Sequence, residues 1–310
     1  MNSSSVKTLR IATRNSPLAL WQAHFIRDQL LAKYEQLDVE IVGMTTKGDQ
    51  ILDRSLSKVG GKGLFMKELE EALLDGRADI AVHSMKDVTV DLPEGLEVSC
   101  VCARETPNDA FVSNNYHSLH ELPAGSVVGT SSLRRRAQLK HHFPQLEIKE
   151  LRGNVNTRLR KLDNGEYDAI ILAAAGLIRL GFEDRIADLI AIKDSLPAVG
   201  QGIVGIENRA DDVEIKQLIA VLNDKQAEIC IAAERRMNQS LDGGCSVPIA
   251  GFAQLDGETL SMQGVVGDIE TGQLLSASAQ GEAKNAAEIG QQVAQQLIDQ
   301  GAKALIAKAR

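Results

Sequence analysis

The sequence is poor in aromatic residues and in cysteine, and each shortage excludes a class of protein. Only 3% of the 310 residues are aromatic, which leaves few platforms on which single-stranded nucleic acid could stack. The cysteines are too few for a disulfide-stabilised scaffold in a chain of this length; they are Cys100, Cys102, Cys230 and Cys245. We therefore expect neither a single-strand binder nor a disulfide-rich domain.

Long apolar segments are also missing. The longest apolar run, residues 169–178, is too short to span a bilayer. Residues 1–8 lack the apolar stretch of a secretory signal. The sequence therefore predicts a cytoplasmic protein with reduced thiols and no membrane partner.

Positive charge is scarce overall but concentrated locally. The net charge is −8, from 34 Lys and Arg against 42 Asp and Glu, which argues against a nucleic-acid partner. Residues 128–161 hold nine Lys and Arg but only Glu147 and Glu150, so this stretch carries +7 and the remainder −15. A cationic site in an acidic chain predicts an anionic ligand held in one place.

Strand-like and helix-like segments alternate through residues 6–103 and again through 126–174. This alternation predicts two α/β domains with mixed sheets and helices on both faces. Strand 203–207 is expected to return to the first domain, and strands 249–255 and 259–266 with a helix over 286–309 predict a small α+β domain. The expected boundaries are 1–104 with 200–220, then 105–199, and finally 221–310.

Residues 11–16 and 128–132 share a local plan, in which a strand runs into Thr and Ser and then into a helix. Hydroxyl groups and free N–H groups at a helix N-terminus favour anions, although they also serve as simple helix caps. Arginines beside both turns favour the anion site; the residues concerned are Arg14, Ser16, Thr130, Ser132, Arg134 and Arg135.

A polar turn, residues 83–87, follows a short apolar strand, where α/β proteins place ligand-binding groups. Asp87 could act as an acid–base group or as a counter-charge, and Lys86 could bind an anionic substituent. The alternative is a salt-bridged turn. His83 is expected to be a local hydrogen-bonding partner, because no cluster has the spacing of a metal site.

Three further arginines, Arg152, Arg158 and Arg179, follow predicted strand ends and could converge on one crevice. Guanidinium groups bind carboxylates through two parallel hydrogen bonds. Several arginines thus match a ligand with several carboxylates or phosphates, while the nucleotide-binding glycine signatures are missing.

Two glycine-rich segments complete the candidates. Cys245 follows Gly243 and Gly244 in a turn, where it could be a nucleophile or a chance loop cysteine. Cys100 and Cys102 are expected to be buried small side chains. The segment 46–63, which holds Lys58 and Lys62, predicts a flexible loop that could close over a site.

Taken together, these segments resemble the porphobilinogen deaminase (hydroxymethylbilane synthase) family. The resemblance covers nearly the whole chain and includes HSMKDV at 83–88 and GGCSVP at 243–248. The other matching segments are 10–23, 58–65, 78–82, 129–135, 151–155 and 196–202. Thr89 departs from the family pattern, which has proline there; proline would stiffen the turn that carries Asp87.

The resemblance implies a transferase of porphyrin and heme biosynthesis. It implies the head-to-tail condensation of four porphobilinogen molecules into hydroxymethylbilane with release of ammonia. It also implies two domains like the lobes of periplasmic binding proteins, a third small domain, a monomer, and a product passed to uroporphyrinogen-III synthase.

The resemblance assigns roles to individual residues as well. Asp87 corresponds to the family's catalytic aspartate, and Cys245 to the cysteine that carries a covalent dipyrromethane cofactor through a thioether. Lys58 and Lys62 fall in the loop. The residues implied in cofactor and substrate binding are Arg14, Ser16, Lys86, Thr130, Ser132, Arg134, Arg135, Arg152, Arg158, Arg179 and Gln201.

Two other functions fit parts of the sequence. A two-lobed anion-binding protein without catalysis would use the same hydroxyls and arginines but would carry no covalent adduct. A nucleic-acid contact through residues 134–142 would weaken steeply with salt, and the acidic chain around that helix disfavours it.

Overall fold

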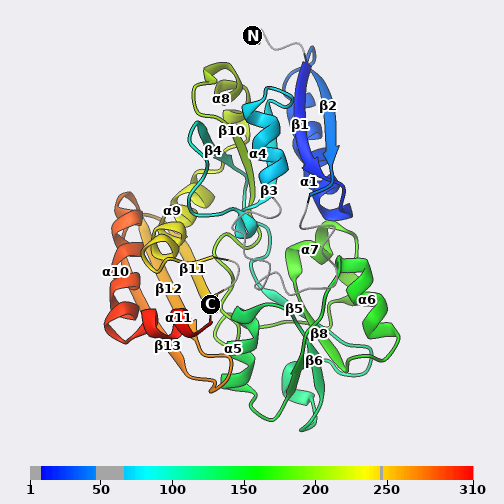
Figure 1. Ribbon diagram of the computed structural model, residues 1–310, viewed down its shortest axis with the longest axis vertical. Helices are drawn as coiled ribbons and strands as arrows, with labels where there is room; N and C mark the ends of the chain where they lie inside the picture. Colours follow the sequence, from blue (N-terminus) through cyan, green and yellow to red (C-terminus); the bar gives the residue numbers. More distant parts are fainter. Residues whose placement is uncertain (1–7, 47–65, 245–246, 310) are drawn as a thin grey trace. The chain divides into compact units, whose positions relative to one another are not determined.

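The computed structural model describes residues 8–46, 66–244 and 247–309. The chain divides into two compact units (Figure 1). Unit 1 comprises Met1–Arg104 and Ile203–Glu228, and unit 2 comprises Glu105–Gly202 and Ile229–Arg310. Each unit is built on its own five-stranded sheet.

The unit 1 sheet is mixed. Its strands are, in spatial order, β2 (Asp38–Met44), β1 (Thr8–Arg14), β3 (Ile80–Ser84), β10 (Val204–Arg209) and β4 (Leu96–Val101). β1 runs parallel to β2 and β3, whereas β10 runs antiparallel to β3 and β4. The predicted return of strand 203–207 to the first domain is thereby confirmed.

Helices cover both faces of this sheet, which explains why its strands are apolar on both sides. The helices are α1 (Pro17–Leu31), α4 (Lys67–Leu74) and α8 (Val213–Ile219), with short 3-10 turns η1 (Met85–Asp87) and η4 (Ala220–Leu222). Ile11 packs with α1 and α8 on one face. Ala12 and Ala81 pack with Leu69 and Leu73 of α4 on the other.

The unit 2 sheet repeats the same strand order. Its strands are β7 (Glu147–Lys149), β6 (Val127–Gly129), β8 (Ala169–Ala173), β5 (Asp109–Val112) and β9 (Asp188–Leu189). β6 runs parallel to β7 and β8, and β5 runs antiparallel to β8 and β9. The accompanying helices are α5 (Leu133–His142), α6 (Val155–Asp163), α7 (Ala174–Arg179), η2 (Leu119–Glu121) and η3 (Glu183–Arg185).

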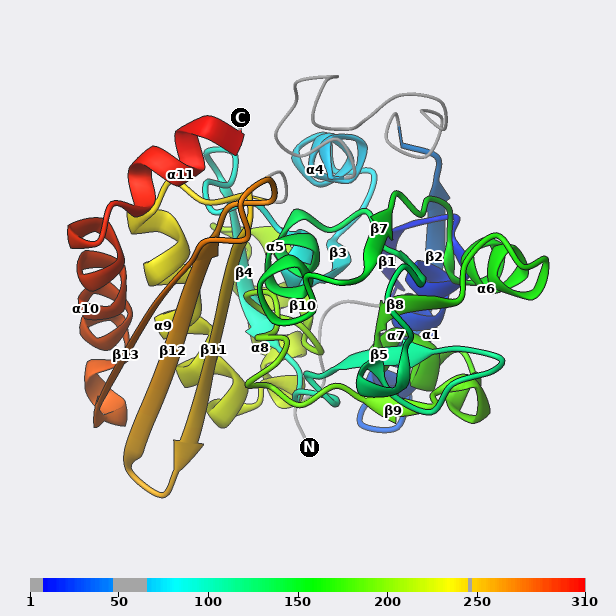
Figure 2. The same cartoon turned by 90° about the horizontal axis from the view of Figure 1, so that it is seen from below.

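The C-terminal part forms an antiparallel three-stranded sheet (Figure 2). Its elements are β11 (Ile249–Asp256), β12 (Thr259–Gly267), β13 (Leu274–Glu282), η5 (Ala283–Asn285), α9 (Lys225–Ser240), α10 (Ala286–Asp299) and α11 (Ala302–Ala309). Met237 of α9 and Val293 of α10 pack so closely on Gly264 that a Cβ atom there would lie 2.5 Å from the sulfur of Met237. The expected single helix over 286–309 breaks at Gly301, whose φ is +99°.

The predicted fold class is confirmed, with two mixed α/β sheets and a small C-terminal α+β part. Several elements were not predicted: β5, α7, β9 and β13. The predicted loop over 46–63 lies outside the described residues except for Thr46. Among the helices that the structure describes, none has the length and apolar character needed to cross a membrane.

Candidate active site

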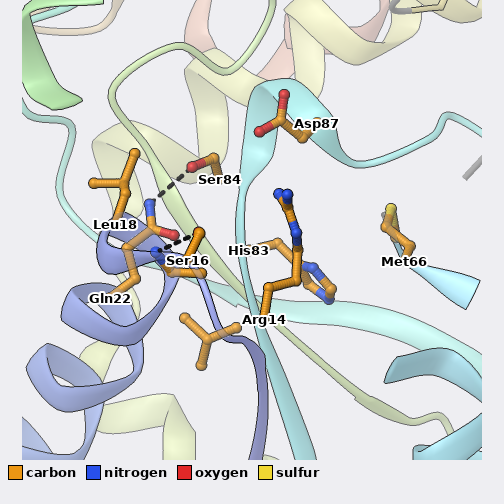
Figure 3. A pocket seen from close by; sticks show the side chains of 10 residues that line it. Arg14, Ser16, Leu18, Gln22, Met66, His83, Ser84 and Asp87 are labelled. Atoms are coloured by element: carbon orange, nitrogen blue, oxygen red, sulfur yellow. Dashed lines mark hydrogen bonds between the residues drawn. The ribbon is translucent and has the colours of Figure 1, made fainter. Parts of the chain in front are cut away.

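The first set of candidate residues gathers at one edge of the unit 1 sheet. Because β1 and β3 are parallel, the residues that follow them meet at the same edge. Arg14 ends β1 and Ser16 follows it, while Ser84 ends β3 and Asp87 follows it. All four line a small pocket of about 60 Å³ (Figure 3).

Ser16 is the N-cap of α1. Its hydroxyl accepts a hydrogen bond from the backbone N–H of Ala19 at 3.3 Å, which satisfies one of the free donors of the helix. The side-chain amide of Gln22 donates to the hydroxyl of Ser84 at 2.8 Å and so ties α1 to the end of β3. The first turn of α1 therefore forms a wall of the pocket.

Asp87 lies on η1, and its side chain is exposed. The backbone N–H of Met85 donates to the carbonyl of Ile203 at 3.0 Å, which fixes the turn to the segment entering β10. The side chain of Met85 lies over Gly205, where a Cβ atom would be only 2.1 Å from its sulfur. In Figure 3 the side chain of Arg14 extends toward the turn that carries Asp87.

Thr89, the departure from the family pattern, is accommodated locally. Val88 has an extended backbone, with φ −75° and ψ 124°. The hydroxyl of Thr89 donates to the carbonyl of Asp91 at 2.9 Å. A side-chain hydrogen bond thus constrains the segment that proline would otherwise stiffen.

His83 belongs to β3 and not to the turn in which the sequence placed it, because it pairs with Gly205 of β10. Its Nε2 atom lies 2.8 Å from Oε2 of Glu207. The expectation that His83 is a hydrogen-bonding residue is confirmed, although its partner lies 124 residues away in the sequence, on the neighbouring strand β10. Among the described residues, no group of His, Cys, Asp and Glu could hold a metal ion.

The second set gathers at an edge of the unit 2 sheet. β6, β7 and β8 are mutually parallel, so the residues after their ends share one edge. Thr130 and Ser132 follow β6, Arg152 follows β7, and Arg179 ends α7 after β8. Ser132 caps α5 by accepting from the N–H of Arg135 at 3.4 Å.

Arg134 and Arg135 are not surface residues. Their exposed fractions are 5% and 6%, and both guanidinium groups contact the carboxylate of Asp109, at 2.9 Å and 2.7 Å. Burial raises the pKa of Asp109, but the two arginines outweigh it and hold that pKa far below its usual range. Burial lowers the pKa of Arg134, and Asp109 partly restores it.

Gln201 and Ser195 complete this internal cluster. The amide of Gln201 donates to Asp109 at 2.9 Å and to the carbonyl of Pro107 at 2.6 Å. The hydroxyl of Ser195 donates to the other oxygen of Asp109 at 2.7 Å. Sequence reasoning missed Asp109 and Ser195. The one signal for Asp109 was its position directly before the apolar run 110–112, and Ser195 had no comparable signal.

Arg152, Arg158 and Arg179 remain half-buried. Arg152 contacts the carboxylate of Glu150 at 2.7 Å. Arg158 donates to the carbonyl of Gly153 at 2.7 Å, and Arg179 donates to that of Gly202 at 2.7 Å. Hydrogen bonds of these kinds hold a guanidinium group in place without fully neutralising it or removing it from water.

Cys245, Lys58 and Lys62 lie outside the described residues. Before Cys245, the N–H of Gly243 donates to the carbonyl of Asn238 at 2.8 Å and ends α9. Cys100, Cys102 and Cys230 are buried thiols outside any disulfide, so the predicted burial of the first two is confirmed.

Comparison with known proteins supplies the family. Residues 9–217 match the model described as "Porphobilinogen deaminase, dipyromethane cofactor binding domain", and residues 228–299 match "Porphobilinogen deaminase, C-terminal domain". Porphobilinogen deaminase of Chromobacterium violaceum is 59% identical over 297 residues, which cover 96% of each chain.

Solved structures also align with part of the chain at low identity. The methionine-binding protein MetQ is 14% identical, with a TM-score of 0.45, over 72% of this chain and 92% of its own. A putative methionine-binding lipoprotein of Bacillus subtilis is 15% identical, with a TM-score of 0.45, over 71% of this chain and 92% of its own.

The family models and the close relative together establish that the chain belongs to the porphobilinogen deaminase family, whose members are transferases that make hydroxymethylbilane and bind a dipyrromethane cofactor.

Proposed function

We propose that the chain joins four porphobilinogen molecules head to tail, with Asp87 as the catalytic acid–base residue. The observation that supports this role is the position of Asp87 on an exposed turn that lines the same pocket as Arg14 and Ser16. A carboxylate and a cation facing one pocket suit a substrate that carries both an aminomethyl group and carboxylate arms.

The donor groups in each unit suit a ligand with several carboxylates. Guanidinium groups, hydroxyls and helix N-termini all favour carboxylates. The dipyrromethane supplies the pyrrole carbon to which the first substrate is joined. Cys245 would hold it through a thioether, and the half-buried Arg152, Arg158 and Arg179 would bind its carboxylates. A tether keeps the growing chain local and replaces repeated encounters with intramolecular ones.

Asp87 has three tasks in this proposal. It assists the loss of ammonia from the aminomethyl group of porphobilinogen, and it stabilises the electron-poor azafulvene that remains. It then takes part in removing the proton that the attacking α-carbon must lose. Lys86, half-buried beside it, binds a substrate carboxylate.

The arginine pair plays a different part. Arg134 and Arg135 are each bonded to Asp109, so we assign them to shaping the binding edge as well as to binding carboxylates. Thr130 and Gln201 are almost fully buried, and their contribution is to hold this edge in place. Ser132 is the N-cap of α5 and places its hydroxyl at a helix N-terminus, where an anion is favoured.

The remaining expectations concern the cell and the assembly. We propose a cytoplasmic monomer that passes its product to uroporphyrinogen-III synthase. Reducing surroundings suit thiols that lie outside any disulfide, as those of Cys100, Cys102 and Cys230 do. We also propose three domains, with boundaries at 1–104 with 200–220, at 105–199 and at 221–310.

The role of Asp87 is tested by Asp87→Asn. We expect folded protein with its cofactor and a turnover about 10²–10⁴-fold lower, the usual contribution of general acid–base catalysis. Asp91→Asn, an exposed carboxylate on the same segment, is the matched control and should keep normal turnover. Near-normal turnover in Asp87→Asn would exclude the proposed role.

The thioether is tested by intact-protein mass. Wild-type protein should carry the added mass of two pyrrole units and give the colour of pyrroles with acidic Ehrlich reagent. Cys245→Ser should carry neither, whereas Cys230→Ala, a change at a buried thiol, should carry both. An unchanged adduct on Cys245→Ser would refute the attachment site, and a reversible ligand without any adduct would favour the non-catalytic anion-binding protein.

A further inference from the structure

A buried group of acid–base side chains borders the unit 1 pocket and has no part in the function proposed above. Nε2 of His83 on β3 lies 2.8 Å from Oε2 of Glu207 on β10, and their side chains are only 6% and 0% exposed. The other oxygen of Glu207, Oε1, is buried and has no hydrogen-bond partner among the described residues. A wholly buried carboxylate with one orphaned oxygen is costly, and this cost calls for an explanation.

Glu70 of α4 belongs to the same group. It is 9% exposed. Burial first, and then the charge of Glu207, raise the pKa of Glu70 to about 7, while His83 lowers it. Two carboxyl groups and one imidazole therefore share the space between α4 and the sheet.

The Glu207 contact constrains the chemistry of the imidazole. An ionised carboxylate only accepts hydrogen bonds, so an ionised Glu207 requires the ring hydrogen of His83 on Nε2, the atom that lies 2.8 Å from Oε2. In the neutral ring Nδ1 is then a hydrogen-bond acceptor. Since His83 is one of the residues that line the pocket with Arg14 and Asp87, this second nitrogen is the polar atom that the ring has left to offer a ligand.

The same strand, β10, also fixes the neighbouring turn. Gly205 pairs with His83 and makes room for Met85. One strand therefore sets both the ring of His83 and the turn that carries Asp87. Such double anchoring is typical of residues that orient a reacting group by way of another.

We propose that Glu207 is a positioning residue, supported by Glu70, which holds His83 in the Nε2–H tautomer so that Nδ1 accepts a hydrogen bond from an N–H group of porphobilinogen. This inference rests on the proposed function, because the ligand that supplies the N–H group is the substrate. Both the aminomethyl group and the pyrrole nitrogen of porphobilinogen can donate.

The test compares Glu207→Leu, Glu207→Gln and the matched control Glu97→Leu in the holoenzyme. Glu97 lies on β4, is 39% exposed and pairs with Lys216. We expect kcat/KM for porphobilinogen to fall about tenfold in Glu207→Leu, the worth of one hydrogen bond, and to be largely kept in Glu207→Gln, whose amide oxygen still accepts from the ring. Glu97→Leu should behave as wild type.

A spectroscopic readout separates positioning from a general loss of stability. In ¹⁵N spectra recorded without substrate, the ring of His83 should show the Nε2–H tautomer in wild type and Glu207→Gln and a mixture in Glu207→Leu. Hydrogen on Nδ1 in wild type, or full kcat/KM in Glu207→Leu after the tautomer is lost, overturns the proposal. The wild-type spectrum tests the tautomer of His83 independently of turnover, so it stays decisive even if Asp87→Asn refutes the proposed function. It also stays decisive if Glu207→Leu does not fold and only wild type and Glu207→Gln can be measured.

Discussion

Asp109 is the residue whose replacement should damage unit 2 most. Its carboxylate, 0% exposed, accepts from Arg134, Arg135, Ser195 and Gln201 at 2.7–3.0 Å. Asp109→Asn keeps the shape and removes the charge, which leaves two buried guanidinium groups without a counter-ion. Removing one partner of a buried ion pair costs about 3–5 kcal/mol, a large part of the roughly 5–15 kcal/mol that keeps a protein folded.

The matched control is Asp163→Asn. Asp163 contacts Arg185 at an equally short 2.6 Å, but its side chain is 47% exposed, and exposed pairs are worth at most about 1 kcal/mol. Urea unfolding gives the free energies, and hydrogen exchange of the amides in β5 and β8 reports unit 2 specifically. If Asp109→Asn costs no more than Asp163→Asn, burial does not govern the strength of this cluster and the reasoning fails.

The difference in unfolding free energy between wild type and Asp109→Asn should depend on pH, and the direction of this dependence can be derived. Because the pKa of Asp109 is lowered on folding, its contribution to stability is complete above the pKa of an unfolded aspartate, about 4. The contribution declines only as the pH falls below that value toward the lower pKa of the folded state. The stability gap between wild type and Asp109→Asn should thus be constant from pH 7 to about pH 4 and shrink at lower pH.

Two further predictions concern the half-buried arginines of unit 2 and the turn of unit 1 that carries Asp87. Arg158→Ala removes a half-buried cation and should raise KM by about 10- to 100-fold, the value of a charge-assisted hydrogen bond, while the midpoint of urea unfolding stays unchanged. Arg134→Ala should raise KM and also lower the unfolding midpoint. Equal unfolding midpoints for the two variants would refute the distinction between the half-buried and the buried arginine. Gly205→Ala should lower the free energy of unfolding by about 1–3 kcal/mol and lower kcat, because a Cβ atom there meets the sulfur of Met85 at 2.1 Å. Adding Met85→Ala should restore much of the stability. No recovery in the double variant would show that Met85 is not the obstacle.

Local signals made much of the fold predictable. Ser16 followed by Pro17 marks the start of α1 because an N-cap and its helix are neighbours in the chain. The apolar run from Ile203 marks β10 in the same way. By contrast, β13 was missed because Ser276, Ala277 and Ser278 are small and weakly patterned, and the strand is defined by its pairing with β12.

The residues of the candidate site also fall into two groups, those with a local sequence signal and those defined by partners far away in the sequence. Hydroxyls and arginines after strand ends could be found because each belongs to one strand and one turn. The partners of His83 and of the arginine pair could not, since Glu207 is 124 residues from His83 and Asp109 is 25 residues from Arg134. A sequence shows that a charged residue is present, but its counter-charge is set by the topology of the sheet.

The distant partners also change how the positive charge of residues 128–161 should be interpreted. The +7 of residues 128–161 includes Arg134 and Arg135, whose counter-ion, Asp109, lies outside that stretch. Asp109 offsets one of these two positive charges and holds both guanidinium groups inside unit 2, so a ligand meets less positive charge than the count suggests. We therefore expect the half-buried Arg152, Arg158 and Arg179 to carry a larger share of carboxylate binding than the buried pair. A guanidinium group that is still in contact with water can exchange that contact for a ligand without breaking the internal ion pairs.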